Sequence, residues 1–263
     1  VYPNAQLVSG DQTKEFSAMR SGLIDMAVGS TINWSPQVPE VNLFSLPFLM
    51  PDNTAVDAIT QGEAGKTVFE AIAKRGVIPL AWGENGFREI SNSKQPITMP
   101  ADLKGMKIRV VGSPLFLDTF NALGANPTQM SWADAMPALT TGAVDGQENP
   151  LSVFSAARAD RANQKYLSLW HYMNDPLIFG VSERVWKTIA EEDQAMLKQA
   201  AYDAGQWGIK KSRAELDETL VQIRERGVEV NELTPEQHQA FVDATKGVYD
   251  KWIPRIGKDL VDA

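Results

Sequence analysis

The sequence of 263 residues contains no cysteine and only 2 histidines. Without cysteine the chain has no disulfide, no thiol nucleophile and no thiolate metal ligand, a composition that suits an exported bacterial protein. Basic side chains are also few, with 25 Lys and Arg against 33 Asp and Glu and a net charge of −8. Because binding to nucleic-acid phosphates needs a basic face, this balance predicts no nucleic-acid partner.

Long apolar runs and enzyme signatures are missing too. No segment approaches the roughly 18 apolar residues of a membrane-spanning helix. The chain has no Gly-x-Ser-x-Gly elbow, no phosphate-cradling glycine loop and no His-Glu-x-x-His. We therefore expect no catalytic residues, no metal and no cofactor. The chain opens at "VYPNAQLVSGD" without a signal peptide, a start that resembles the end of a strand and predicts trimming.

Helical and strand patterns alternate along the chain, which predicts an α/β fold. Helices are expected over 14–21, 54–74, 113–124 and 132–142, and strands over 23–30, 77–85 and 106–111. The apolar segment 42–52 is broken by two prolines and predicts either a strand or a buried loop. The stretch 188–226 has a 3.6-residue apolar rhythm, which predicts one long kinked helix or two helices in sequence.

Two segments of the sequence resemble each other. "MRSGLIDMAVG" and "LTTGAVDGQEN" both place a glycine at a helix end and an aspartate three residues later, Gly22 with Asp25 and Gly142 with Asp145. Two similar lobes, each with a helix leading into a central strand, would produce this pattern. Ligands of such sheets bind at the carboxyl ends of the strands, so the pattern favours a cleft between two lobes.

One arginine stands inside a short apolar strand pattern, "KGMKIRVVGSP". In an extended chain Arg109 points to the face opposite Ile108 and Val110. An amphipathic edge strand with a solvated basic face explains this, because long cations usually lie in water. The alternative is an arginine that projects from a strand end into a cleft, where its planar fork grips a carboxylate.

Three other stretches are rich in polar groups. "WGENGFREISNS" places Glu84, Asn85 and Arg88 around a glycine in a passage between strands. "QMSWADAM" starts a helix with an N-cap serine beside Trp132, which either faces solvent or packs in the core. "VDGQENP" brings Asn149 to a strand end, although turn chemistry alone explains much of that segment.

For neither histidine does the sequence favour a role in ligand binding. His238 lies among polar residues on an early helical turn, where we expect exposure to solvent. His171 is surrounded by aromatic residues in "SLWHYMNDPL", which predicts a packed, hydrogen-bonded side chain, with a ligand contact as the alternative.

Seven motifs together resemble one family. "YPNAQL", "SGLIDMAVGS", "LPFLMPD", "ENGFREISNS", "PADLKGMKIRV", "GANPTQM" and "AVDGQENP" occur in this order in the substrate-binding proteins of TRAP transporters, the DctP-type family. The resemblance runs from Tyr2 to about Arg226. It implies a periplasmic protein, a monomer without cofactor, that captures a small organic acid and hands it to a sodium-driven membrane permease.

The resemblance also implies site residues. The family's carboxylate clamp corresponds to Arg109, and this favours the cleft interpretation over the solvated edge. Ser30 falls where members place a specificity residue of variable type. The remaining implied positions are Arg88, as a second fork, Asn149, Trp132 and His171, with Glu84 and Asn85 at the border of the cleft.

The family fold implies two α/β lobes around a ligand cleft, joined by crossing strands and braced by the long helical stretch after residue 188. The first lobe is expected to hold 1–85 and 176–215, and the second 86–175 and 216–263. Family members begin with a strand and a helix before "YPN" that are missing here, and the strand belongs in the middle of the first lobe's sheet.

The ligand remains open between a sugar acid, such as a uronate or an aldonate, and a C4-dicarboxylate. The carboxylate of Glu84 tilts the expectation towards a hydroxyl-rich acid. The alternative function is an α/β enzyme that acts on an anionic metabolite in the same cleft. It requires a base or nucleophile beside Arg109, for which the sequence offers only His171.

Overall fold

A computed structural model describes residues 1–3 and 5–263. Its strands are β1 (Met26–Ser30), β2 (Val77–Asn92), β3 (Lys107–Val110), β4 (Asn126–Gln129), β5 (Gly146–Pro150), β6 (Tyr166–Leu169), β7 (Asn174–Ser182) and β8 (Glu229–Glu232). The helices are α1 (Glu15–Ser21), α2 (Thr31–Trp34), α3 (Asn53–Gln61), α4 (Glu63–Ala73), α5 (Pro114–Ala122), α6 (Trp132–Thr141), α7 (Leu151–Ala156), α8 (Glu183–Trp186), α9 (Glu191–Ala214), α10 (Leu216–Glu225), α11 (Pro235–Ile256) and α12 (Lys258–Asp262).

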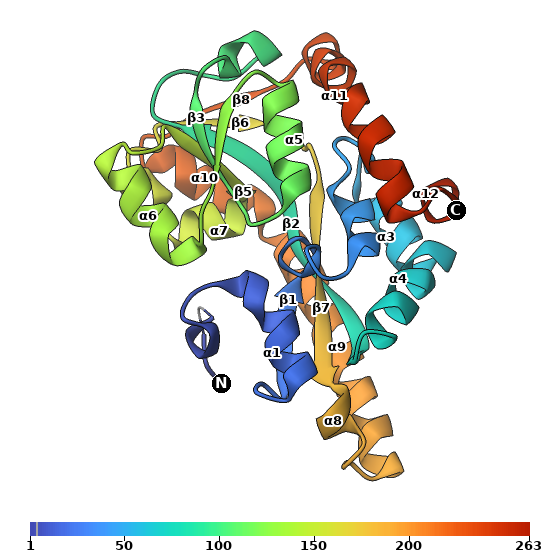
Figure 1. Ribbon diagram of the computed structural model, residues 1–263. Helices are drawn as coiled ribbons and strands as arrows, with labels where there is room; N and C mark the ends of the chain where they lie inside the picture. The colour runs from blue at the N-terminus through green and yellow to red at the C-terminus, as the bar shows by residue number, and fades with distance from the viewer. Residues whose placement is uncertain (4) are drawn as a thin grey trace.

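Strand β2 belongs to both lobes of the α/β fold. Its first half pairs antiparallel with β7, which pairs in turn with β1. Its second half pairs antiparallel with β5, followed by the parallel strands β3 and β4. Figure 1 shows β2 and β7 running from the lower lobe, with α1, α3 and α4, towards the upper lobe, with α5, α6 and α7. The expected two-lobed α/β architecture with crossing strands is confirmed.

Strand β2 is longer than expected, because the sequence predicted a strand over 77–85 followed by a passage to the next strand. The pairing with β7 shifts register between Glu84 and Gly86, and Gly86 takes φ 110. This is a β-bulge at a residue without Cβ, which bends a strand without ending it. The polar stretch therefore lies within one strand at the junction of the lobes.

One further helix differs from the expectation. The helix expected over 54–74 is divided by Gly62, whose extended backbone ends α3 and precedes α4. The segment 42–52, expected as a strand or a buried loop, forms no strand; it continues the 3-10 helix Pro39–Ser45 into turns that are largely buried. Proline lacks the N–H that a strand ladder needs, which explains the absence of a strand in this proline-bounded segment.

The long helical stretch forms two helices in sequence, α9 and α10, one of the two forms expected. Helix α9 packs on β2, and α10 packs on α7 of the second lobe. Gly205 permits the close approach of α9, because a Cβ at this position would lie 2.2 Å from the carbonyl oxygen of Trp82. The two helices together brace both lobes.

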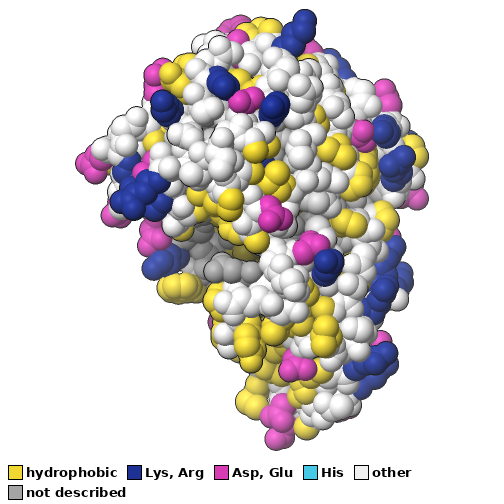
Figure 2. Space-filling model, turned by 60° about the vertical axis from the view of Figure 1, so that its left-hand side comes forward, with side chains coloured by type: hydrophobic (Ala, Val, Ile, Leu, Met, Phe, Trp, Pro, Cys, Tyr) yellow, Lys and Arg dark blue, Asp and Glu magenta, His cyan; other side chains and the backbone are white. Residues whose placement is uncertain are grey.

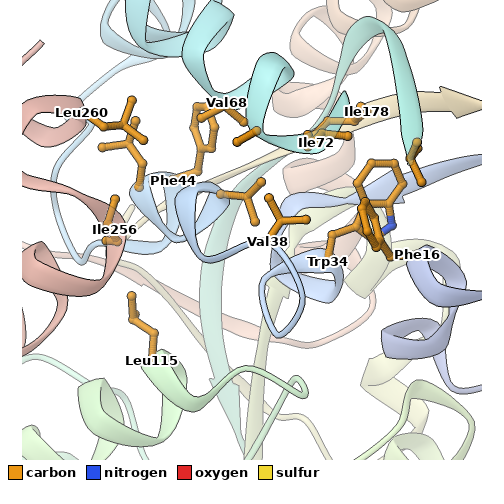
Figure 3. Close-up of a cluster of buried hydrophobic side chains, with 14 of the residues drawn as sticks. Phe16, Trp34, Val38, Phe44, Val68, Ile72, Leu115, Ile178, Ile256 and Leu260 are labelled. Carbon is orange, nitrogen blue, oxygen red and sulfur yellow. The ribbon is translucent and has the colours of Figure 1, made fainter. Parts of the chain in front are cut away.

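Each lobe has its own apolar core. The core of the first lobe surrounds Trp34, which packs against Phe16 at 5.4 Å between ring centroids (Figure 3). The ring lies over two glycines of the sheet, since a Cβ on Gly29 or Gly180 would lie 2.3 or 2.8 Å from its atoms. The second core holds Ile90, Ile108, Val110, Phe116, Phe120, Trp170 and Tyr172.

The C-terminal region contacts both cores. Phe241 of α11 packs in the second core, whereas Val248, Trp252 and Ile256 pack in the first. Leu260 of α12 joins Ile256 near Phe44 (Figure 3). This packing differs from the expected division, which gives all of 216–263 to the second lobe. Helix α11 spans 22 residues, about 33 Å at 1.5 Å per residue, and is long enough to reach both cores.

The internal resemblance corresponds to equivalent positions in the two lobes. Gly22 ends α1 with φ 79, and Gly142 ends α6 with φ 74. A strand follows each glycine, β1 and β5, and a short helix follows each strand. The carbonyl oxygens of Asp25 and Asp145 accept hydrogen bonds from the backbone N–H groups of Ser182 and Ser93, at 2.8 and 2.9 Å.

Candidate functional site

A cavity of about 770 Å³ lies between the lobes, and Figure 2 shows the surface hollowed there. The carboxyl ends of β1, β3 and β5 and the bulge of β2 contribute to its wall. Six of the expected site residues are among those that line it: Ser30, Asn85, Arg88, Arg109, Trp132 and Asn149. Its apolar wall includes Val8, Ile24, Val28, Val111, Val153, Leu177 and Phe179.

Arg109 is buried, with 2% of its surface exposed, so the interpretation as a solvated edge residue is wrong. Its Nε and Nη2 donate to the carbonyl oxygen of Met130 at 3.1 and 2.8 Å. Its guanidinium lies 5.6 Å from the ring centroid of Trp132, a cation–π distance. Within the described part of the chain, Nη1 has no hydrogen-bond partner and Arg109 forms no ion pair.

Burial dominates the electrostatics of Arg109. It lowers the pKa of the guanidinium to about 10, with Glu148 opposing the shift and the positive charge of Arg88 adding to it. The group therefore keeps its charge at neutral pH. A buried charge without a counter-ion costs several kcal/mol, and an anion in the cavity would offset that cost.

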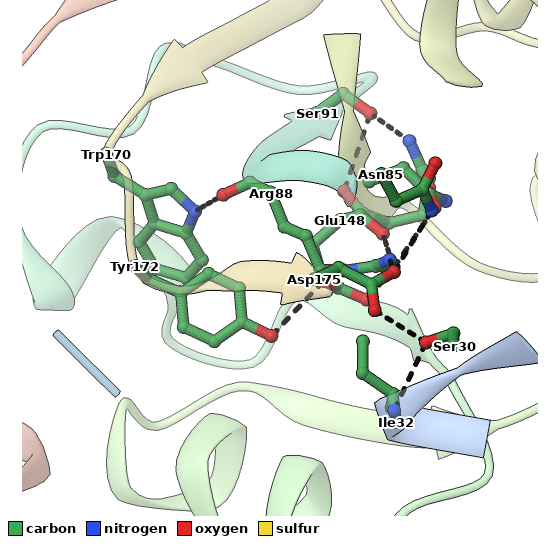
Figure 4. A network of polar contacts seen from close by, with 11 residues as sticks. Ser30, Ile32, Asn85, Arg88, Ser91, Glu148, Trp170, Tyr172 and Asp175 are labelled. Carbon is green, nitrogen blue, oxygen red and sulfur yellow. Dashed lines mark hydrogen bonds and ion pairs between the residues drawn. The ribbon is translucent and has the colours of Figure 1, made fainter. Parts of the chain in front are cut away.

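Arg88 has the opposite environment, because two carboxylates already bind it (Figure 4). Its Nε and Nη2 donate to Glu148, with 2.9 Å between Nη2 and Oε1, and its Nη1 donates to Oδ2 of Asp175 at 3.1 Å. Nη2 also donates to Oδ1 of Asn149 at 3.0 Å. Burial lowers the pKa of Arg88, but the charges and hydrogen bonds of Glu148, with Asp175, raise it above its usual value. The structure thus shows no free second fork.

Asp175 connects the lobes at the cavity wall. Its Oδ1 accepts from the hydroxyl of Ser30 at 2.5 Å, and its Oδ2 accepts from Nδ2 of Asn85 at 3.0 Å (Figure 4). Ser30 in turn accepts from the backbone N–H of Ile32 and so caps α2. Behind Arg88, the hydroxyl of Tyr172 donates to Glu148 at 3.2 Å.

Glu84 is not among the residues that line the cavity. Its carboxylate accepts from Nε of Arg213 at 3.0 Å, and the same guanidinium donates to Asp57 of α3 at 2.9 and 2.8 Å. The three side chains form an ion network that joins β2, α3 and α9. Burial of Glu84 in this network removes the reason to expect a sugar-hydroxyl acceptor there.

The histidines also differ from their interpretations. The side chain of His171 is 50% exposed, does not line the cavity, and has Nδ1 3.3 Å from Glu89. It is therefore not packed in the core, and its backbone takes φ 48. His238 is partly buried rather than exposed, because its ring packs edge-on against Phe48 at 5.0 Å.

Sequence reasoning missed the two carboxylates that bind Arg88. Glu148 was visible as part of the polar segment "VDGQENP", but nothing in the sequence pairs it with a residue 60 positions earlier. Asp175 lies 87 positions after Arg88 and gives no local signal. Only the crossing of β2, β5 and β7 brings these groups together.

Neither a metal centre nor a membrane span is found in the part of the chain that the structure describes. No three His, Cys, Asp or Glu side chains within it gather to hold an ion. Likewise, no helix of residues 1–3 and 5–263 is both long and apolar enough to cross a bilayer.

Two α/β lobes enclose a cavity lined by a buried arginine that forms no ion pair within the described residues, an arrangement typical of a solute-binding protein. The family described as bacterial extracellular solute-binding protein, family 7 (DctP), matches residues 1–255, and the chain belongs to it. The 2,3-diketo-L-gulonate-binding periplasmic protein YiaO of Escherichia coli is 32% identical over 100% of this chain and 80% of its own length. The C4-dicarboxylate-binding periplasmic protein DctP of Rhodobacter capsulatus is 31% identical, over 100% and 78%.

Solved structures support the same relationship. A TRAP periplasmic solute-binding protein of Ralstonia eutropha H16 with bound (S)-2-acetolactate is 60% identical and superposes with a TM-score of 0.97, covering 99% of this chain and 84% of that one. A TRAP protein of Sulfurospirillum deleyianum with bound succinate is 31% identical, with a TM-score of 0.93 and coverage of 100% and 85%. The family resemblance read from the motifs is confirmed.

Proposed function

We propose that this protein captures a small organic acid in the cavity between its lobes, with Arg109 as the group that binds the carboxylate. The observation that carries the proposal is the buried charge of Arg109, which lacks a carboxylate partner in the described residues. Two parallel N–H···O bonds to a carboxylate would complete its coordination, and lysine cannot reproduce that geometry.

The other lining side chains have supporting roles in this proposal. Trp132 covers the Arg109 guanidinium and excludes water from the ion pair. Asn85, Asn149 and Ser30 offer polar atoms to the rest of the ligand. Arg88 maintains the shape of the polar wall through Glu148 and Asp175. Glu84 and His171 have no role in the site.

The ligand belongs, in our proposal, to the acids that relatives hold. The candidates are a sugar acid, such as the β-D-galacturonate of a Sulfitobacter protein, a C4-dicarboxylate such as succinate, and a short hydroxy-oxo acid such as (S)-2-acetolactate. All carry a carboxylate for Arg109. We place the protein in the periplasm, as a monomer that delivers the acid to the membrane permease of a TRAP transporter.

The position of His171 supports binding rather than turnover. An enzyme would need a base or nucleophile beside Arg109, and the one residue expected for that task, His171, does not line the cavity. We therefore expect the bound acid to be recovered unmodified after prolonged incubation with the protein.

Calorimetric titration after a thermal-shift screen of organic acids tests the proposal. A ligand bound only to the folded state raises the melting temperature, which identifies the acid. Arg109→Ala should then weaken its binding at least a hundredfold, because breaking a buried ion pair costs roughly 3–5 kcal/mol and ~1.4 kcal/mol is tenfold. Arg109→Lys should fall between wild type and alanine.

The matched control is Arg158→Ala, which removes a surface arginine paired with Asp160 and should leave affinity unchanged. Binding by Arg109→Ala as tight as that of the wild type would refute the clamp. A large fall in the melting temperature of the ligand-free Arg109 variants would instead make the residue structural.

A further inference from the structure

The charged side chains that line the cavity differ in sign and in whether a partner of opposite charge already binds them. Among the described residues, the acidic side chains that line it are Glu15, Asp25 and Asp175, and the basic ones are Arg88 and Arg109. Only Arg109 lacks a carboxylate partner, so the cavity offers one cation for an anionic ligand. A second carboxylate on the ligand would need a second free cation.

Arg88 cannot supply that cation. Its single positive charge is bound by Glu148 and by Asp175, which are 0% and 1% exposed as side chains. This buried group of three therefore carries a net charge of −1 when both carboxylates are ionised. A ligand carboxylate beside Arg88 would meet the charge of Asp175 with no surplus of positive charge to offset the repulsion.

The hydrogen bonds that Asp175 already accepts leave it suited to a hydrogen-bond donor on the ligand. A carboxylate has about four lone-pair positions, and three are taken here, one by Ser30 and two by Asn85 and Arg88. The remaining position is on Oδ1, and Asp175 is among the residues that line the cavity. The hydroxyl hydrogen of Ser30 is committed to Asp175, so this corner accepts a ligand hydroxyl better than it donates to a carboxylate.

The geometry points to Asp175 as a specificity residue that selects hydroxylated monocarboxylates and rejects dicarboxylates. This inference rests on the proposed function, in which Arg109 binds the ligand's one carboxylate. The hydroxyl of the acid donates to Asp175 at the other side of the polar wall. The inference narrows the candidate ligands by removing succinate and other C4-dicarboxylates.

Three acids of equal chain length test the inference by calorimetric titration. Malate differs from 2-hydroxybutanoate by a carboxylate in place of the terminal methyl group, and butanoate lacks the hydroxyl. The wild type should bind 2-hydroxybutanoate at least tenfold more tightly than either of the others. In Asp175→Asn, the preference over malate should fall at least tenfold, because the repelling charge is gone.

The asparagine can be accommodated, since its amide can donate to Oγ of Ser30 while its oxygen accepts from Arg88. Asp175→Ser provides a second neutral variant if the asparagine variant does not fold, which the melting temperature of each ligand-free form reports. Asp57→Asn removes an equal charge on α3, outside the residues that line the cavity, and should keep the wild-type preference.

The outcomes of these titrations distinguish failure of the inference from failure of the proposed function. Equal wild-type affinity for malate and 2-hydroxybutanoate overturns the inference, as does an unchanged preference in both neutral Asp175 variants. In either case the proposed function survives if Arg109→Ala abolishes the binding that is seen. Failure of the wild type to bind 2-hydroxybutanoate also overturns the inference, and the proposed function then stands if the acid found by the thermal-shift screen loses its binding in Arg109→Ala. Binding that survives Arg109→Ala counts against the proposed function itself, and the inference falls with it.

Discussion

We expect the two lobes to close on the ligand by hinge motion, and a substitution at one glycine should oppose that closure. Gly112 follows β3 in the second lobe and lies against Thr13 of the first, so that a Cβ at Gly112 would be 2.5 Å from Cγ2 of Thr13. The neighbouring residue Ser113 meets Ser35 of the first lobe at 3.1 Å between hydroxyl oxygens. These contacts join the lobes beside the cavity-lining residues Gln12 and Val111, and we expect them to break when the lobes separate.

Gly112→Ala should therefore weaken ligand binding with little effect on the ligand-free fold. Its φ lies outside the left-handed region, so alanine fits the backbone and the cost is the clash alone. Overpacking by a methyl group costs about 1–3 kcal/mol. If that cost is confined to the closed state, the dissociation constant rises by roughly 5- to 150-fold. Calorimetric titration measures this rise directly.

Thr13→Ser supplies the control, because it removes Cγ2 and keeps the hydroxyl that donates to Asp11 at 2.6 Å. The double variant Thr13→Ser with Gly112→Ala should recover most of the lost affinity. Wild-type affinity in Gly112→Ala, or an equal loss in the double variant, would refute closure by approach of these two segments.

Two further predictions concern the cavity wall. Burial raises the pKa of Glu15 from 4.5 to about 7, so the folded state favours the protonated carboxyl group. The Glu15 side chain therefore contributes its full stabilisation of the fold below pH 4.5, and this stabilisation is lost as the pH rises to about 7. The melting temperature should fall over that range, by less in Glu15→Gln, and an identical pH profile in the variant would contradict the assignment. Ligand binding should change tryptophan fluorescence through Trp132, which lies beside Arg109. Trp132→Phe should remove most of this change, and a signal that persists would place the responding tryptophan elsewhere.

Local signals in the sequence predicted the elements that depend on single residues. Gly22 and Gly142 end their helices in the left-handed conformation, and the hydroxyl of Ser131 accepts from the backbone N–H of Asp134 at the start of α6. Each of these features is decided within about four residues of chain, so a short motif contains the information.

Features that depend on distant partners were not predictable in the same way. The bulge at Gly86 preserves β2 only because β7 lies beside it to continue the ladder. Glu84 has the spacing of a cleft residue, yet Arg213, 129 positions later, binds it in a network with Asp57. Arg88 is likewise bound by two carboxylates, Glu148 and Asp175, that only the folded chain brings near.

A crystal structure of the protein with the acid that gives the largest thermal shift tests the central claim most directly. The account predicts that both oxygens of the ligand's carboxylate lie about 2.7–2.9 Å from guanidinium nitrogens of Arg109, one of them Nη1, with Glu148 and Asp175 still bound to Arg88. A carboxylate bound away from Arg109, or one that displaces Glu148 or Asp175 from Arg88, would contradict it.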